Sequence, residues 1–129
     1  LMDGVFSRNP TLRGAAVELG AGWVPELLKR LDWVAKIYGR VDESVRFERT
    51  PSEQLTQQMG FTPFPHEDVA NLVSQSNEEL YLFSSDYPHV EGGRDPVGKF
   101  TKALENESAV VNDNFFSENF LRLFPDSRV

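Results

Sequence analysis

Short apolar runs alternate with helix-like patterns along this chain, and this alternation most constrains the fold that the chain can adopt. The apolar runs cover residues 12–19, 58–64 and 79–84, and a helical pattern follows each of them. Runs of this length fit strands, although periodicity alone does not separate a buried strand from a short piece of helix. Strands that alternate with helices indicate βαβ units, a parallel sheet and right-handed crossovers. We therefore predict an α/β fold whose first strand, 12–19, is buried on both faces.

The clearest helix is predicted over residues 24–38. Its apolar residues recur at steps of three and four, which is the spacing of one face of an α-helix. Pro25 stands in the first turn, where a helix tolerates proline, and Gly39 stands where a helix commonly stops. The apolar face consists of Val24, Leu27, Leu28, Leu31, Val34, Ile37 and Tyr38.

Local signals predict where the other helices begin. Thr50 and Glu53 have the spacing of a capping box. Further helices are predicted to open at 65–68 and at 95–96. In the second of these, Asp95 fits an N-cap ahead of the first-turn proline Pro96. A last helix is expected over 113–124, with an apolar side formed by Phe116, Phe120, Leu123 and Phe124.

The predicted sheet is thin. A free-standing flavodoxin-like domain has about five strands, so the three strands are alternatively an arc of a larger sheet with two unpaired edges. The length of 129 residues suits one domain, 1–129, and is too small for two. The opening Leu1–Phe6 resembles the tail of a helix that ends at Asn9-Pro10. A cloning boundary or a tag remnant explains such a start, as does a longer polypeptide, and we expect the longer polypeptide.

Composition excludes several classes of function. The chain has 40% hydrophobic, 12% aromatic and 26% charged residues, which is typical of soluble globular proteins. Its 20 acidic and 13 basic side chains give a formal charge of −7, which repels phosphate backbones and anionic lipid surfaces, so we expect no nucleic acid and no membrane as partner. No apolar run approaches the roughly 18 residues of a membrane helix, and no signal segment opens the chain. With no cysteine present either, the expected location is cytoplasmic.

Two carboxylates stand at the predicted carboxyl ends of strands, where parallel α/β proteins place their active sites. Glu18 lies near the end of the first strand, and Asp86 follows the third. A rigid strand fixes the Asp86 carboxylate while the loop shapes a pocket, which suits a metal ligand or a general base. The alternative is that Asp86 bonds to the backbone of its own turn, as loop aspartates commonly do.

The other candidate residues carry less specific signals. His89 stands three residues past Asp86 and can reach the same pocket, whereas His66 fits a solvated residue at a helix start. No His-x-His or His-x-x-x-His pair is present. Trp23 fits the core or a pocket wall, and we predict that Trp23 and His89 contact a substrate. The glycine pair within 91–94 lacks a phosphate-loop pattern.

The loop 84–96 resembles a known family. Its sequence, Ser-Ser-Asp-Tyr-Pro-His-Val-Glu-Gly-Gly-Arg-Asp-Pro, strongly resembles the end of the last barrel strand in the amidohydrolase-related family of metal-dependent hydrolases and decarboxylases. This family includes aminocarboxymuconate-semialdehyde decarboxylase-like enzymes. Residues 9–25 are similar to the family's sixth strand and helix, and 118–124 are similar to its usual terminal helix. The resemblance covers nearly the whole chain.

The resemblance implies a (β/α)8 TIM barrel of which this chain supplies the C-terminal part, about strands six to eight. Such barrels take about 250 residues, so roughly half of the barrel lies outside this chain. In the family, three histidines and an aspartate after the last strand hold a divalent metal. The aspartate matches Asp86, and the histidines would precede Leu1. Asp86 is thus implied to be a metal ligand and to accept a proton from the metal-bound water, whose pKa the metal lowers toward about 7. We expect the metal to be zinc.

One departure from the family concerns the residue after the sixth strand. Many relatives have a catalytic histidine there, in a His-x-Gly-Gly setting, whereas this chain has Glu18 in Glu-Leu-Gly-Ala. A carboxylate also accepts a proton, although it is anionic at pH 7 and a weaker base. Glu18 is therefore the second predicted catalytic residue, beside Asp86.

Three functions are compatible with these observations. The first is the C-terminal part of a metal-dependent hydrolase or decarboxylase that acts on a small molecule. The second is a barrel fragment that is catalytically silent alone and whose open strand edges drive association with itself, as a homo-oligomer, or with the missing barrel part. The third is a small non-enzymatic α/β binding module with a pocket above the sheet.

Overall fold

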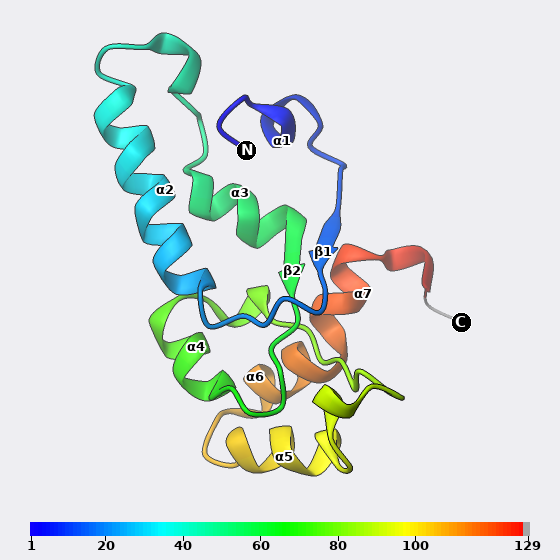
Figure 1. Cartoon of the computed structure of the whole chain (residues 1–129). Coiled ribbons are helices and arrows are strands. Elements are labelled where there is room, and N and C mark those ends of the chain that lie inside the picture. Colours follow the sequence, from blue (N-terminus) through cyan, green and yellow to red (C-terminus); the bar gives the residue numbers. More distant parts are fainter. Residues whose placement is uncertain (128–129) are drawn as a thin grey trace.

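A two-stranded parallel sheet lies at the centre of the molecule, with helices around it (Figure 1). The structure is a computed structural model, and it describes residues 1–127. Strand β1 (Gly14–Ala16) pairs with β2 (Met59–Phe61), with Ala15 opposite Gly60. A single parallel bridge from the last residue of β2 to Tyr81 continues the sheet on the other side of β2. The mixture of helices with a small parallel sheet confirms the predicted α/β class.

The helices that begin at Val24, Pro51 and Pro96 start where they are predicted. The helix predicted to open at 65–68 begins at Val69, and the last helical region, predicted from 113, begins at Ala109. Helix α2 (Val24–Tyr38) has Pro25 in its first turn and Gly39 at its C-cap. The capping box between Thr50 and Glu53 forms at the start of α3 (Pro51–Gln58). The other α-helices are α1 (Val5–Arg8), α4 (Val69–Gln75), α5 (Pro96–Ala103), α6 (Ala109–Asp113) and α7 (Asn119–Leu123).

The strands are shorter than predicted. The first strand, expected over 12–19, is β1 alone. Its residues are half-buried rather than covered on both faces, and no strand of residues 1–127 pairs with the edge opposite β2. The prediction of a third strand over 79–84 is wrong, since this stretch is a 3₁₀ turn at Glu78–Leu80 followed by the bridge at Tyr81.

The C-terminal helical region occupies the backbone groups that a longer third strand needs. The buried side-chain amide of Asn119 donates to the carbonyls of Glu78, at 2.7 Å, and Tyr81, at 3.0 Å. The backbone N–H of Phe83 donates to the carbonyl of Phe115 at 2.9 Å. Because these groups are already satisfied, they are not available for a strand ladder.

A π-helical turn over 114–118 joins α6 to α7 and changes which side of the last helix is buried. A π turn holds more residues than an α turn, so it keeps positions four residues apart on one face. The buried residues follow that step: Val111, Phe115, Asn119 and Leu123. The predicted apolar side is therefore wrong for Phe120, which is 47% exposed.

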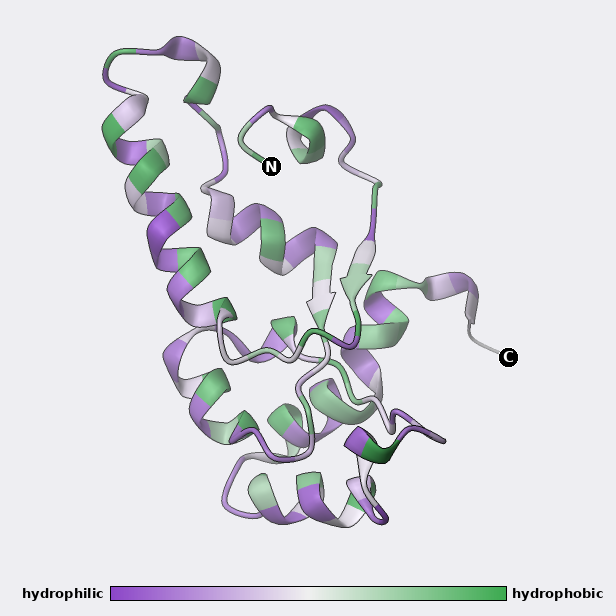
Figure 2. Cartoon of the chain, viewed as in Figure 1, coloured by the Kyte–Doolittle hydropathy of each residue, from purple (hydrophilic) through white to green (hydrophobic). Residues whose placement is uncertain are grey.

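The core fills the space between the sheet and the surrounding helices. Its largest fully buried apolar side chains are Tyr81, Phe100, Leu80, Leu104 and Leu123. Hydrophobic and hydrophilic residues alternate along the helices, as the pattern of α2 predicts (Figure 2). Among the helices of residues 1–127, none combines the length and the apolar character that crossing a membrane requires.

Candidate active site

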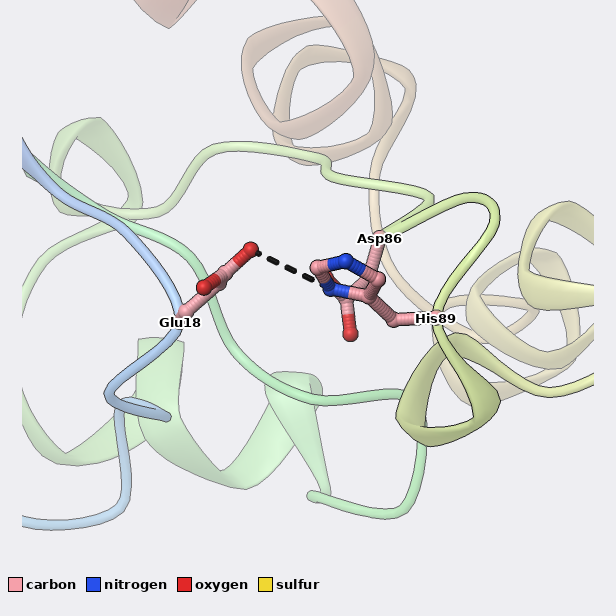
Figure 3. Close-up of side chains that lie close together, drawn as sticks. All are labelled: Glu18, Asp86 and His89. Carbon is pink, nitrogen blue, oxygen red and sulfur yellow. Dashed lines mark ion pairs between the residues drawn. The ribbon is translucent and has the colours of Figure 1, made fainter.

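Glu18, Asp86 and His89 converge near the carboxyl ends of the parallel strands (Figure 3). One potential ligand atom of each residue lies within 4.8 Å of those of the other two. His89 Nδ1 lies 3.5 Å from Glu18 Oε1 and 3.4 Å from Asp86 Oδ1. The Asp86 side chain is 10% exposed, whereas those of Glu18 and His89 are 60% and 59% exposed. The structure thus brings together three of the four residues for which the sequence predicts a role in the site.

Both carboxylates stand on an uncommon backbone conformation. The φ angle is 60° at Glu18 and 54° at Asp86, and these are the two non-glycine residues of 1–127 with positive φ. Residues other than glycine rarely occupy this left-handed region, and those that do cluster at functional sites. The two residues come from separate loops, and their carboxylates lie beside the His89 ring (Figure 3).

The loop after Tyr81 holds Asp86 and His89 against each other. The His89 N–H donates to the Asp86 carbonyl at 2.8 Å, which closes a four-residue turn. The loop then folds back so closely that a Cβ atom at Gly92 would clash with the Ser85 carbonyl. The polar contact of the Asp86 carboxylate is with the His89 ring. This contact differs from the alternative in which Asp86 bonds to the backbone of its own turn.

The Glu67 side chain forms hydrogen bonds with the backbone of the loop that carries Glu18. Its carboxylate accepts hydrogen bonds from the backbone N–H groups of Ala21, at 3.0 and 3.1 Å, Gly22, at 2.6 Å, and Phe64, at 2.7 Å. A carboxylate only accepts hydrogen bonds, so a cluster of backbone donors suits it. Sequence reasoning places Glu67 merely at a helix start and misses this contact, because Ala21 is 46 residues away and the pairing has no local signal.

Trp23 lies at the end of the same loop but outside the three-residue cluster. Its indole N–H donates to the carbonyls of Leu19, at 3.2 Å, and Gly20, at 3.1 Å. Its ring packs edge-on against Phe61, with ring centroids 5.5 Å apart. Trp23 also lines a separate surface cavity of about 350 Å³ with Glu26, Leu27 and Arg30.

His66 does not join the cluster either. Its ring stacks on Phe64, with centroids 5.6 Å apart, and it lies just before α4. The exposed position agrees with the solvated residue that the sequence predicts.

The cluster fits a divalent cation. Carboxylate oxygen and imidazole nitrogen are donors that Zn²⁺ and related ions accept. Two ligands about 2.1 Å from one ion in a tetrahedral arrangement lie about 3.4 Å from each other. The distances from His89 Nδ1 to Asp86 and Glu18, 3.4 and 3.5 Å, agree with that separation.

Comparisons with known proteins identify a solved structure with a similar fold. No protein-family model matches the chain, and no curated protein matches it. A crystal structure of an amidohydrolase from Mycobacterium avium subsp. paratuberculosis K-10 matches with a TM-score of 0.77 and 32% sequence identity, over 93% of this chain. This chain has an amidohydrolase-related fold. It spans 30% of the length of the solved amidohydrolase, which is consistent with a fragment of a TIM barrel.

The amidohydrolase-related fold confirms the coarser part of the predicted resemblance. The decarboxylase-like subfamily, the assignment of barrel strands six to eight, and the roles of the site residues stay predictions.

Proposed function

We propose that this chain is the C-terminal part of a metal-dependent amidohydrolase-type enzyme, a hydrolase or a decarboxylase that acts on a small molecule. The observation that carries the proposal is the convergence of Glu18, Asp86 and His89 near the strand ends of an amidohydrolase-related fold. In this proposal the chain forms about strands six to eight of a (β/α)8 barrel in a cytoplasmic enzyme. The remaining metal ligands come from the part of the barrel that this chain does not contain.

In the proposed site, Asp86 would hold a divalent cation, and Glu18 and His89 lie beside its carboxylate. Zinc is the cation that we propose; when bound, it supplies Lewis acidity and lowers the pKa of a water toward about 7. Asp86 is shielded from solvent and accepts a proton at a carboxylate oxygen, while His89, 3.4 Å away, orients that carboxylate. Glu18 is more exposed and accepts a proton on the side from which a substrate enters.

The chain supplies only part of the wall of the proposed substrate pocket. The cleft beside Glu18 and Asp86 has a volume of about 10 Å³, which is room for about one water. Small-molecule pockets usually measure about 300–1,000 Å³. Trp23 and His89 are proposed to contact the substrate, and the remaining walls come from the rest of the barrel.

The first experiment measures zinc binding by calorimetry to a full-length enzyme that contains this chain, because the remaining proposed metal ligands lie outside the chain. Asp86→Asn removes the charge and suits the backbone, because asparagine is among the residues that best tolerate positive φ. We expect its zinc affinity to fall at least about tenfold, as losses at metal sites commonly do. The exposed Asp126→Asn is the matched control. Unchanged zinc affinity in Asp86→Asn contradicts the assignment, and in a full-length enzyme the same substitution should also sharply lower turnover.

The unpaired edge of β1 supports a second function, in which the chain is a barrel fragment that associates through this edge. The Thr62 N–H donates to the Ala16 carbonyl at 3.2 Å, so the backbone polar groups of Ala16 point toward β2. Alternate residues of a strand bond to opposite neighbours, so the N–H and C=O of Ala15 face the edge that lacks a partner strand within residues 1–127. We propose that this edge pairs with the missing barrel part or, in its absence, with a second copy of the chain.

A further inference from the structure

A second cavity lies at the opposite end of α2 from the candidate active site. It measures about 480 Å³ and lies between the C-terminal half of α2 and residues 45–51, which lead into α3. Helix α2 has 15 residues and begins directly after the loop that carries Glu18. The lining of the cavity begins at Asp32, so at 1.5 Å per residue about 12 Å of helix lies between the start of α2 and the cavity. The volume lies in the range of about 300–1,000 Å³ that small-molecule pockets occupy.

Four apolar side chains form part of the walls of this cavity. Ala35 lines it from α2, and Val45, Phe47 and Pro51 line it from the facing segment. The Phe47 ring is half-buried and has no aromatic partner in the part of the chain that the structure describes. The walls therefore suit a ligand with an apolar, ring-sized body.

Two of the charged residues that line the cavity already have partners. The Asp32 carboxylate accepts from the backbone N–H of Ser52, at 2.8 Å, and from its hydroxyl, at 2.6 Å. Arg46 donates to the Gly39 carbonyl and pairs with Glu43 at 3.0 Å. Neither of these residues needs a ligand to satisfy its charge.

The other two charged residues, Lys36 and Arg40, are both cationic and stand one turn apart. Within residues 1–127, neither side chain has a hydrogen bond or an ion pair. The end of α2 favours cations through the helix dipole, but like charges four residues apart repel each other. The lining of the cavity carries three cationic side chains, Lys36, Arg40 and Arg46, and one anionic side chain, Asp32. An anion placed between Lys36 and Arg40 relieves the repulsion.

We propose that this cavity binds an organic anion with an apolar body. Lys36 and Arg40 hold the anionic group, a carboxylate or a sulfonate, and the apolar body lies against Phe47. The site is distinct from the Glu18, Asp86 and His89 cluster, and the proposal stands independently of the metal and of the reaction.

The test compares two fluorescent probes that share an apolar ring system. Anilinonaphthalene sulfonate carries an anionic group, and phenylnaphthylamine has the same rings without it. Fluorescence titration of the 129-residue chain gives both affinities, and amide NMR shifts locate the bound sulfonate. We expect the sulfonate to bind more tightly than the neutral probe and its shifts to lie at Lys36, Arg40 and Phe47. Shifts elsewhere, or equal affinities for the two probes, overturn the proposal.

Substitution of the two cations provides the second arm of the test. Lys36→Gln and Arg40→Gln each weaken sulfonate binding by about two- to fivefold, the range expected for an exposed ion pair, and leave the neutral probe unaffected. Lys29→Gln, on an exposed position earlier in the same helix, is the matched control and leaves both affinities unchanged. Both cationic side chains are exposed, so their replacement leaves the fold intact. Full sulfonate affinity in the Lys36→Gln, Arg40→Gln double variant contradicts the assignment.

Discussion

Glu67 shows how a single side chain outside the cluster positions a candidate catalytic residue. We predict that Glu67→Gln loosens the loop that carries Glu18, because the glutamine NH2, which replaces one carboxylate oxygen, cannot accept hydrogen bonds from the backbone donors that this oxygen serves. The unfolding free energy should fall by about 1–3 kcal/mol, measured by urea denaturation. Glu105→Gln, at an exposed position, is the control and should change stability little. Equal losses in the two variants would contradict the role of Glu67.

Tyr81 gives the fold a sensitivity to alkaline pH. Its side chain is fully buried, and its hydroxyl lies 2.7 Å from Ser76 Oγ and donates to the Leu72 carbonyl at 3.3 Å. Burial raises the pKa of the Tyr81 hydroxyl above its ordinary value of 10.0, and the hydrogen bond with Ser76 opposes this in part. Since the pKa is raised in the folded state, the contribution of Tyr81 is fully present below the unfolded value and is lost as the pH rises toward the folded pKa.

We therefore predict that the unfolding free energy declines above about pH 10 and that Tyr81→Phe makes this decline shallower. The variant should also lose about 1 kcal/mol at neutral pH with its hydrogen bonds. Denaturant titrations between neutral and alkaline pH measure both effects. Tyr38→Phe, at an exposed position, should leave the slope unchanged, and an unchanged slope in Tyr81→Phe contradicts the prediction.

At the scale of secondary-structure elements, Asn119 connects α7 to residues 78–81, which form the bridge beside β2. Asn119→Ala leaves the carbonyls of Glu78 and Tyr81 without their donor. We expect a loss of about 2–4 kcal/mol in unfolding free energy, because each group that loses its partner in the interior costs about 1–3 kcal/mol. Urea denaturation measures the loss, with the exposed Asn106→Ala as control. A loss below that of the control would show that the segment does not depend on this amide.

At the scale of the whole molecule, the open edge of β1 determines how the chain behaves in solution. We expect the isolated chain to associate beyond its monomer mass of 14.6 kDa as its concentration rises, measured by light scattering after size-exclusion chromatography. Ala15→Pro should reduce this association, because proline removes the N–H that faces the open edge. Ala109→Pro is the control, since the first position of α6 tolerates proline. A monodisperse monomer at all concentrations contradicts the proposed edge.

Local chemistry made the helices predictable. A cap or a terminal residue acts on its own turn, so Pro25, Gly39 and the box between Thr50 and Glu53 mark helix ends without any tertiary contact. The position of Glu18 followed from the first strand, whereas Asp86 was predicted to follow a third strand, of which only a bridge at Tyr81 forms. The sequence predicted that His89 can reach the pocket of Asp86. It did not predict the contact between His89 and Glu18.

The amino-acid sequence was sufficient for the α/β class, for both ends of α2, for the starts of α3 and α5, and for the loops that carry the candidate site. Long-range contacts set the length of the strands, the buried side of the last helix and the clamp formed by Glu67. The physical reason is the range of the forces involved. Helix capping satisfies backbone groups within one turn, whereas a strand or a buried carbonyl is satisfied by whichever distant group the folded chain brings to it, as Asn119 is brought to Tyr81.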